Sequence, residues 1–223
     1  MQRFHDRQDA GRRLAAALTS YAGSDALVLA LPRGGVPVAA EIAASLGAEL
    51  DLLLVRKIGF PSEPEFAMGA VADAPVPILV RNEAAIRAAH VSQAAFDEVA
   101  AREIAELGRR RRLYVGERAH APIAGRTVIL VDDGIATGAT VRAALTALRR
   151  MKPARLVLAV PVGAPDMIAE LRREVDDMVC LMTPSPFGAI GCFYDDFSQV
   201  GDETVVAALA WFGPPASRGG PQS

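Results

Sequence analysis

Short runs of consecutive apolar residues recur along the chain, each followed by turn residues and then by a helical pattern. The runs do not alternate with polar residues, which is typical of strands buried on both faces of a parallel sheet. Helical segments between the runs supply the crossover connections. The pattern predicts an α/β fold: an open, mostly parallel twisted sheet of about five strands flanked by helices. The expected strands are residues 26–31, 50–55, 127–131, 155–160 and 177–182.

Further elements are predicted outside these five strands. The stretch DRQDAGRRLAAAL predicts an amphipathic opening helix with Asp6 or Asp9 as its N-cap. A helical insertion at about 83–112 separates the second strand from the third, with Ser92 as a cap and an interruption at Gly108. The segments FAMGAVA and PVPILV, which precede the insertion, are expected to form an antiparallel pair.

The expected organisation is a single domain over residues 1–212. A small hood at about 183–200 would cover the ligand, and the Gly, Pro and Ser content of residues 213–223 predicts a disordered tail.

Composition narrows the function classes. A length of 223 residues with 51% apolar residues suffices for one α/β domain with an appendage. The net charge of −2 gives no electrostatic reason to expect nucleic-acid binding. The run Arg109–Arg112 would close a helix, complement its dipole and be solvated. No apolar run approaches the roughly 18 residues that span a bilayer. We therefore expect a cytoplasmic protein that binds small molecules, with neither a nucleic acid nor a membrane as partner.

The two cysteines carry no metal-binding or redox pattern. Cys180 and Cys192 have no CxxC or Cys/His neighbourhood. They are expected to be buried or half-buried small residues.

The stretch VILVDDGIATGAT, residues 128–140, combines two acids with a loop suited to an anion. It follows the third strand, at the carboxyl end where open α/β sheets bind ligands. Gly138 lets the loop turn tightly, and the following helix points its positive end at the same place. A phosphate there cannot share its position with Asp132 and Asp133, because like charges repel. The acids suit vicinal hydroxyls or a metal ion such as Mg²⁺. Phosphate on one side and a diol on the other describe a ribose 5-phosphate.

A second strand, glycine turn and helix occur in ALVLALPRGGVPVAAEIAASL. Arg33 and the backbone N–H groups around Gly34 and Gly35 predict a second anion site. At the end of the next strand, Arg56 and Lys57 are expected at the same edge of the sheet. The chain contains neither a GK[ST] loop nor a GxGxxG fingerprint at these places.

The stretch 128–140 resembles the phosphoribosyl-pyrophosphate (PRPP) motif of the type I phosphoribosyltransferases. The resemblance implies that Asp132 and Asp133 contact the ribose hydroxyls of PRPP. It assigns the 5-phosphate to Ala136, Thr137, Gly138, Ala139 and Thr140, and the pyrophosphate to Arg33, Gly34, Gly35, Arg56 and Lys57. It also implies a non-proline cis peptide at Pro32–Arg33.

The whole chain, from about Phe4 to about Phe212, resembles a bacterial group of predicted phosphoribosyltransferases whose acceptor is unassigned. The shared features are FHDRQDAGRRLA, LPRGGVPVA, RKIGFPSEPEFAMGAV, ILVDDGIATGAT, AVPV and FYDDF. Ala136 stands where 6-oxopurine enzymes of this class have an aspartate, which argues against guanine and hypoxanthine as acceptors. The ATG order is closer to adenine and uracil enzymes, and the remaining sequence does not choose between them.

The resemblance implies an enzyme of nucleotide metabolism, a glycosyltransferase (pentosyltransferase) that transfers 5-phosphoribosyl from PRPP to a small nucleophile, expected to be a nitrogen heterocycle. Its catalytic residues would be Asp132, Asp133, Arg33 and Lys57, and Mg²⁺ would bind mainly through PRPP, with Asp132 and Asp133 as possible ligands. A homodimer is expected. Two alternatives are a non-catalytic PRPP-sensing regulator and a hydrolase or phosphorylase acting on a phosphorylated ribose.

The acceptor would lie beneath the hood. Phe187, Tyr194 and Phe197 can stack on a flat ring. Asp195 and Asp196 can hydrogen-bond an amine-bearing acceptor or lie in an exposed turn. The aromatic side chains can equally close the edge of the sheet, so the pattern leaves both roles open.

Overall fold

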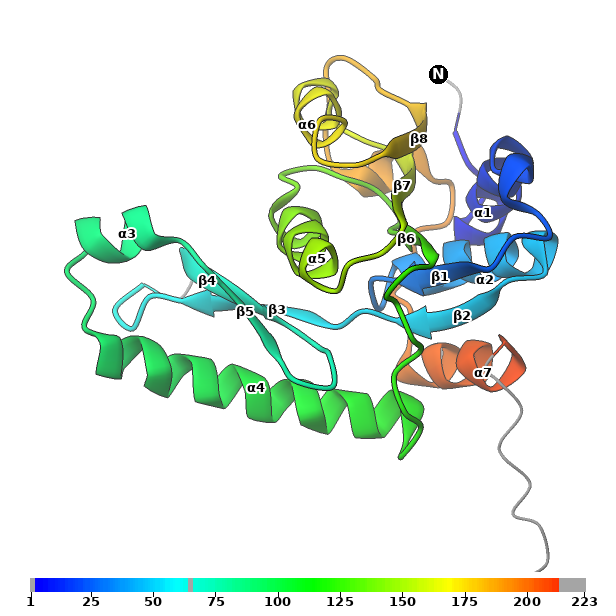
Figure 1. The fold of residues 1–223 in the computed structure, drawn as a ribbon. Coiled ribbons are helices and arrows are strands. Elements are labelled where there is room, and N and C mark those ends of the chain that lie inside the picture. Colours follow the sequence, from blue (N-terminus) through cyan, green and yellow to red (C-terminus); the bar gives the residue numbers. More distant parts are fainter. Residues whose placement is uncertain (1–2, 64–65, 213–223) are drawn as a thin grey trace, which may run out of the picture.

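Five parallel strands form the central sheet of the computed structural model, which describes residues 3–63 and 66–212 (Figure 1). Their spatial order is β2-β1-β6-β7-β8, and every neighbouring pair is parallel. This confirms the predicted fold class. The strands are β1 (Ala26–Ala30), β2 (Glu49–Leu52), β6 (Thr127–Val131), β7 (Arg155–Val162) and β8 (Asp177–Met182).

Helices cover both faces of this sheet. On one face lie α1 (Arg7–Ala17), α2 (Gly35–Leu46) and α7 (Asp202–Phe212), and on the other lie α5 (Ala139–Arg150) and α6 (Pro165–Leu171). Short 3-10 turns occur at Thr19–Tyr21 and Ile190–Phe193. The side chain of Asp6 accepts a hydrogen bond from the Asp9 amide, which confirms Asp6 as the cap of α1.

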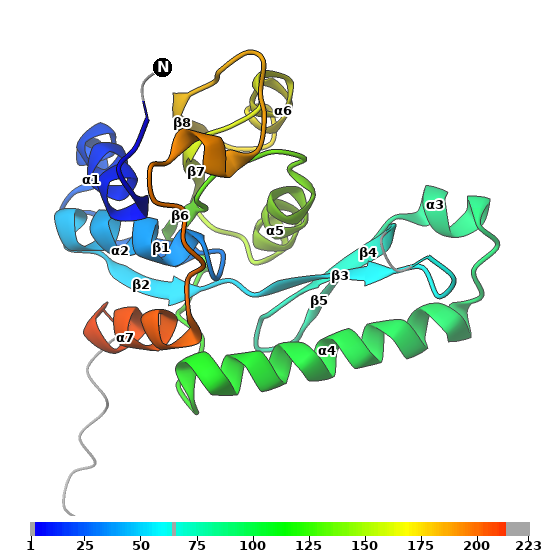
Figure 2. The same ribbon diagram turned by 180° about the vertical axis from the view of Figure 1, so that it is seen from behind.

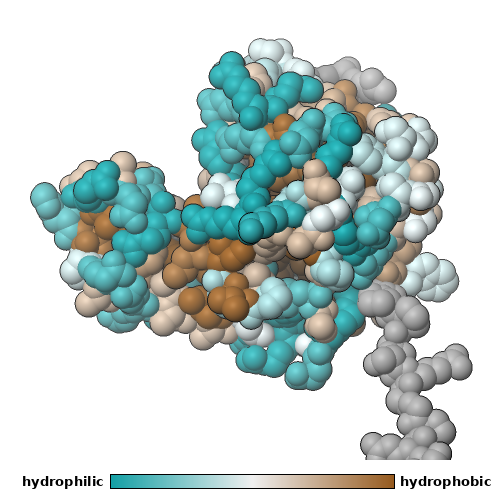
Figure 3. All heavy atoms as spheres, viewed as in Figure 1, coloured by the Kyte–Doolittle hydropathy of each residue, from teal (hydrophilic) through white to brown (hydrophobic). Residues whose placement is uncertain are grey.

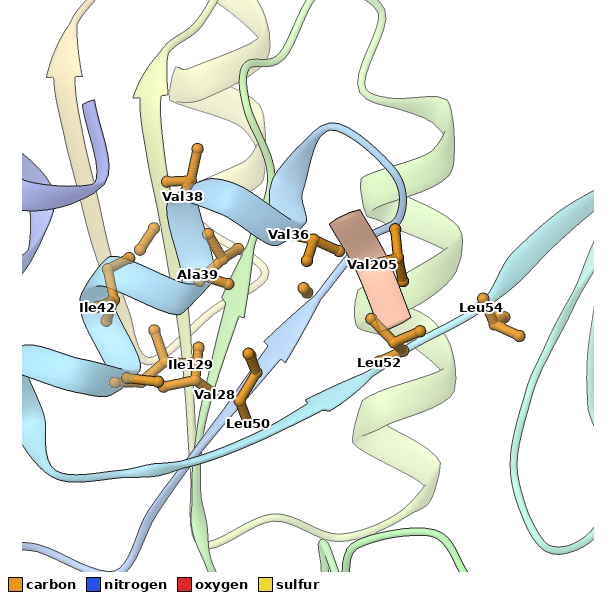
Figure 4. Close-up of a cluster of buried hydrophobic side chains, with 14 of the residues drawn as sticks. Val28, Val36, Val38, Ala39, Ile42, Leu50, Leu52, Leu54, Ile129 and Val205 are labelled. Atoms are coloured by element: carbon orange, nitrogen blue, oxygen red, sulfur yellow. The ribbon is translucent and has the colours of Figure 1, made fainter. Parts of the chain in front are cut away.

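The continuous apolar runs supply two cores at once. Along β1, Val28 packs on the α2 face while Leu27 and Leu29 pack on the α5 face, because successive side chains of a strand point to opposite faces. Figure 4 shows the α2 side of this arrangement, where Val36 and Ile42 lie against the strands. Burial on both faces explains why these strands show no polar alternation.

The segment from Val55 to Val115 forms an arm that projects from the sheet (Figures 1 and 2). Three antiparallel strands and two helices build it: β3 (Val55–Gly59), β4 (Ala67–Ala72), β5 (Ile78–Arg81), α3 (Glu83–Ala88) and α4 (Gln93–Val115). The antiparallel pair expected from FAMGAVA and PVPILV is confirmed, and β3 joins it. The predicted strand 50–55 is therefore two strands. Its apolar run could not reveal the division, since Leu52, Leu53 and Leu54 are all buried.

Helix α4 continues through Gly108, so the predicted interruption there is wrong. A glycine inside a helix costs only about 1 kcal/mol relative to alanine, and the buried Leu107 and Tyr114 on either side anchor the helix. Its N-cap is Ser92 as predicted, since the Ser92 hydroxyl accepts a hydrogen bond from the Ala95 amide.

Buried ion pairs join the arm to the sheet. Arg111 is 8% exposed and its Nη1 lies 2.9 Å from Asp73 Oδ2, while its Nη2 lies 3.7 Å from Asp51 Oδ2. Arg118 Nη2 lies 3.1 Å from the other oxygen of Asp51. The prediction of a fully solvated arginine run at Arg109–Arg112 is therefore wrong for Arg111, because it neutralises two carboxylates that folding removes from water.

Three smaller sequence predictions concern the cysteines, a membrane span and the C-terminal tail. Burial raises the pKa of the half-buried Cys180 thiol to about 11, whereas Cys192 is exposed, contrary to expectation, because it lies in a turn at the surface. Within residues 3–63 and 66–212, no helix has both the length and the apolar character needed to cross a membrane. The tail prediction for residues 213–223 lies outside the described residues.

Candidate functional site

The two acids lie directly after β6, as predicted. Asp133 is 9% exposed and Asp132 is half-buried, and the Asp133 amide donates a hydrogen bond of 2.9 Å to Asp132 Oδ1. Burial raises the pKa of Asp132 well above its usual range, and the neighbouring charge of Asp133 adds to the increase. Burial also raises the pKa of Asp133. A site that desolvates two adjacent carboxylates is typical of a functional centre.

Arg7 from α1 holds Asp133 in place. Arg7 Nε lies 2.7 Å from Asp133 Oδ2, with both side chains largely buried. Arg7 Nη1 also donates to the Ser198 carbonyl at 2.8 Å, and its guanidinium carbon lies 3.8 Å from the Phe197 ring centroid. Sequence reasoning missed this residue. It lies within FHDRQDAGRRLA, but no local pattern indicates contact with a carboxylate 126 positions away.

The loop 136–140 forms an open helix N-terminus. Ala136, Thr137, Ala139 and Thr140 are exposed, while Gly138 is buried and has a φ of 67°. An alanine at Gly138 would be strained there, and its Cβ would lie 2.5 Å from Met167 Sδ. No side chain in the described part of the chain caps α5. The first amides of α5 are therefore oriented for an anion at its positive end.

The turn 32–35 lies beside this loop because β1 and β6 are neighbours in the sheet. The Leu31 amide donates to the Val131 carbonyl at 2.9 Å. The Pro32–Arg33 peptide is cis, which confirms the prediction. A Cβ on Gly34 would lie 2.1 Å from Asp133 Oδ2, so this glycine touches the acid pair directly.

Arg33 lies near the start of α7. Its Nη1 is 3.4 Å from Asp202 Oδ1, and the Tyr114 hydroxyl donates to the same oxygen at 2.7 Å. Asp202 thus connects the turn 32–35 to the arm helix α4. No sequence pattern connects these three distant positions.

The basic pair lies on β3 of the arm rather than on a strand of the parallel sheet, and Arg56 lines a small pocket together with Pro32 and Thr140. Arg56 pairs with Glu103 of α4, and Lys57 follows it along β3. An open cleft of about 720 Å³ lies between the arm and α5, and Lys57, Thr137 and Thr140 all line it. Figure 3 shows the hollow between the arm and the main body, with hydrophobic side chains over the arm. Lys57 therefore faces the loop 136–140, whereas Arg33 lines a different pocket.

That second pocket, which we call the hood pocket, has a volume of about 500 Å³. It is lined by Arg7, Arg33, Gly34, Asp133, Ile190, Phe197, Gln199 and Val200. Four segments therefore meet at this pocket: helix α1, the turn 32–35, the loop after β6 and the predicted hood.

The predicted stacking role does not hold for Tyr194. This residue is 1% exposed because Phe4 and Phe197 pack against it, and its hydroxyl donates to the Asp133 carbonyl at 2.6 Å. Phe187 packs on Phe193, with 5.3 Å between ring centroids. Of the three aromatic residues, Phe197 lines the hood pocket. The other two support the hood.

The acid pair suits a metal ion that arrives with its own ligands. Within the described residues, no group of three or more His, Cys, Asp or Glu side chains could hold a metal ion. Asp133 already faces Arg7. Mg²⁺ prefers oxygen ligands and usually binds through one or two carboxylates together with substrate phosphates. The site therefore fits Mg²⁺ held mainly by a phosphorylated ligand.

Known proteins with similar sequences identify the family of this chain. The family model for the phosphoribosyl transferase domain matches residues 2–196. "Putative phosphoribosyl transferase Rv0571c" of Mycobacterium tuberculosis (strain ATCC 25618 / H37Rv) is 46% identical over 209 residues, and a protein of strain CDC 1551 matches equally well. The matched part covers 94% of this chain and 47% of each relative, so the chain spans about half their length.

A solved structure shares both the fold and much of the sequence. The crystal structure of TT1426 from Thermus thermophilus is 43% identical, with a TM-score of 0.84. The match covers 96% of this chain and all of that protein. The similarity to TT1426 in sequence and in fold therefore extends over nearly the whole of this chain.

Proposed function

Since the chain belongs to the phosphoribosyl transferase domain family, we propose that it transfers the 5-phosphoribosyl group of PRPP to a small nucleophile, a nitrogen heterocycle, and releases pyrophosphate. The observation that carries this proposal is the position of Asp132 and Asp133. They follow β6 between two anion-binding turns, 32–35 and 136–140, at the ends of neighbouring strands. PRPP has this order of groups: pyrophosphate, ribose diol and 5-phosphate.

Each part of the site has a role in this reaction. The amides at the start of α5 and the hydroxyls of Thr137 and Thr140 bind the 5-phosphate, with Lys57 facing them across the arm cleft. Asp132 and Asp133 accept hydrogen bonds from the ribose hydroxyls. Arg33 and the amides near Gly34 bind the pyrophosphate.

The chemistry requires stabilisation of opposite charges on the two sides of C1. The acceptor nitrogen forms a bond to C1 as the C1–O bond breaks, and the electron pair of that bond leaves with pyrophosphate. A ring proton of the acceptor is released to solvent. The sugar becomes oxocarbenium-like, and the carboxylates of Asp132 and Asp133 favour its positive charge. Arg33 stabilises the leaving group, and bound Mg²⁺ would neutralise further charge on the phosphate oxygens.

The alternatives make different predictions. A PRPP-sensing regulator would bind PRPP without turnover, and a hydrolase or phosphorylase would act without a heterocyclic acceptor. The position of Arg33 favours a transferase over both alternatives. Arg33 lies beside the acid pair and lines the hood pocket together with Asp133. An acceptor in that pocket would lie next to C1 of the ribose, where the bond to pyrophosphate breaks.

We expect PRPP with Mg²⁺ to raise the melting temperature of the protein. A ligand that binds only the folded state at 100 times its Kd stabilises that state by about 2.7 kcal/mol. Differential scanning fluorimetry at millimolar PRPP measures the shift. Ribose 5-phosphate and pyrophosphate, tested separately, should each give a smaller shift, because each occupies only part of the site. Absence of any shift with PRPP contradicts the proposal.

A further inference from the structure

The hood pocket offers hydrogen-bond donors and little accessible negative charge. Its charged lining residues are Arg7, Arg33 and Asp133. Asp133 is already paired with Arg7 at 2.7 Å. Gln199, which also lines the pocket, is neutral and can donate or accept. The pocket is therefore suited to ligand groups that accept hydrogen bonds.

The acids of the hood are engaged elsewhere. Asp195 lies 3.2 Å from Arg3 and is more than half exposed. The Asp196 carboxylate accepts hydrogen bonds from the backbone amide and the hydroxyl of Ser198. Neither residue lines the hood pocket. An amine-bearing acceptor would therefore find no carboxylate other than Asp133.

Arg7 is held rigidly enough to discriminate between ligands. Its side chain is 11% exposed, its Nε binds Asp133, and its Nη1 binds the Ser198 carbonyl. Its guanidinium plane lies over Phe197. Among the described residues, Arg7 Nη2 has no protein partner within hydrogen-bond distance. A fixed guanidinium group with a donor left over on the pocket wall is a specific binder of oxygen.

We propose that Arg7 is the residue that selects the acceptor, and that the acceptor is a heterocycle carrying a carbonyl or carboxylate oxygen next to the nitrogen that attacks C1. The oxygen accepts a hydrogen bond from Arg7 Nη2, and the ring lies along Ile190, Phe197 and Val200. This inference rests on the proposed function. A ring that offers only amine donors at that position would leave the Arg7 donor buried and unpaired.

The test measures kcat/KM for the acceptor by pyrophosphate release at saturating PRPP and Mg²⁺. The oxygen-bearing probes are uracil and orotate, and the probes without such an oxygen are adenine and imidazole. The variants are Arg7→Met, Arg7→Lys and the control Arg3→Met, which removes another N-terminal arginine that contacts the hood from outside the pocket. PRPP-induced thermal shifts are measured for every protein in parallel.

We expect the wild-type protein to use at least one oxygen-bearing probe and to prefer it to adenine and imidazole. Arg7→Met should lower kcat/KM for that acceptor roughly 10- to 100-fold, the value of a hydrogen bond to a charged group. Arg7→Lys should retain part of the activity, which separates recognition from failure to fold. Arg3→Met should stay within about twofold of wild type, because an exposed ion pair contributes little.

Three results overturn the inference while leaving the proposed function intact. In the first, PRPP stabilises the protein but adenine or imidazole is preferred, and in the second, Arg7→Met behaves like Arg3→Met. Use of none of the oxygen-bearing probes, with normal PRPP stabilisation, also overturns it. Failure of PRPP to stabilise the wild-type protein instead contradicts the proposed function itself, so the two failures are distinguishable.

Discussion

Replacing Asp132 with Asn should reduce turnover of PRPP by about 10- to 1000-fold, which corresponds to roughly 1.4 to 4 kcal/mol of lost transition-state stabilisation. Asparagine keeps the shape of the side chain and removes the negative charge that favours an oxocarbenium-like sugar. Initial rates of pyrophosphate release at saturating PRPP measure the loss. Unchanged rates would contradict the role assigned to the acid.

The same substitution should leave the protein as stable as before, or more stable, at neutral pH. Folding raises the pKa of Asp132, so the folded state holds the proton more tightly than the unfolded chain. The stability that comes from this tighter proton binding is fully present below the pKa of Asp132 in the unfolded chain. It is lost as the pH rises through the higher pKa of Asp132 in the folded state. At pH 7, above the ordinary pKa of an aspartate, this carboxyl therefore opposes folding. The melting temperature of Asp132→Asn should equal or exceed that of wild type, with a difference that narrows as the pH falls.

Asp133→Asn should show a comparable loss of turnover with a different effect on stability. Arg7 would lose a carboxylate at 2.7 Å while remaining 11% exposed. Breaking a buried ion pair by removing one partner costs about 3 to 5 kcal/mol. The gain from removing a desolvated charge, whose pKa burial raises, is offset by the loss of the Arg7 contact, so the melting temperature of Asp133→Asn should lie below that of Asp132→Asn. Equal melting temperatures in the two variants would show that the Arg7 contact contributes nothing to stability.

Gly34→Ala should reduce turnover by about 10- to 100-fold, the range typical of a displaced transition-state contact. The added Cβ would lie 2.1 Å from Asp133 Oδ2, so the carboxylate must move. Because Arg7 holds that carboxylate, the movement also disturbs the opening helix. Steady-state kinetics with PRPP measure the effect.

Two other glycines provide comparisons for this substitution. Gly188→Ala is the control, because its Cβ meets nothing closer than Cys192 Sγ at 3.9 Å. Gly35→Ala should instead damage folding, since its Cβ would lie 2.7 Å from the Val131 carbonyl oxygen of a central strand. A Gly34→Ala variant as active as Gly188→Ala would mean that the turn does not need to touch Asp133.

Local patterns sufficed for those parts of the fold in which one segment determines its own structure. The strand Thr127–Val131 and the strand Asp177–Met182 follow from uninterrupted apolar runs. The cap at Ser92 follows from side-chain chemistry next to a helical pattern. The order of acids and glycines in 128–140 predicted the two acids directly after a strand and the glycine turn before the next helix, because a single short segment builds both.

Contacts between distant segments could not be predicted in this way. Arg7 and Asp133 are 126 positions apart, and Arg33, Tyr114 and Asp202 come from three separate elements. Their pairing depends on how the helices pack, which no local spacing encodes. The division between β2 and β3 was hidden for a related reason, since Leu52, Leu53 and Leu54 are all buried although they join strands of different sheets.

The most direct test of the central claim is pyrophosphate release from PRPP by the purified protein with Mg²⁺ and a pool of heterocycles. We predict release that depends on the added heterocycle and falls about 10- to 1000-fold in Asp132→Asn. We also predict a product in which the 5-phosphoribosyl group is joined to ring nitrogen. Stabilisation by PRPP without any heterocycle-dependent release, or release that Asp132→Asn leaves unchanged, would contradict this claim.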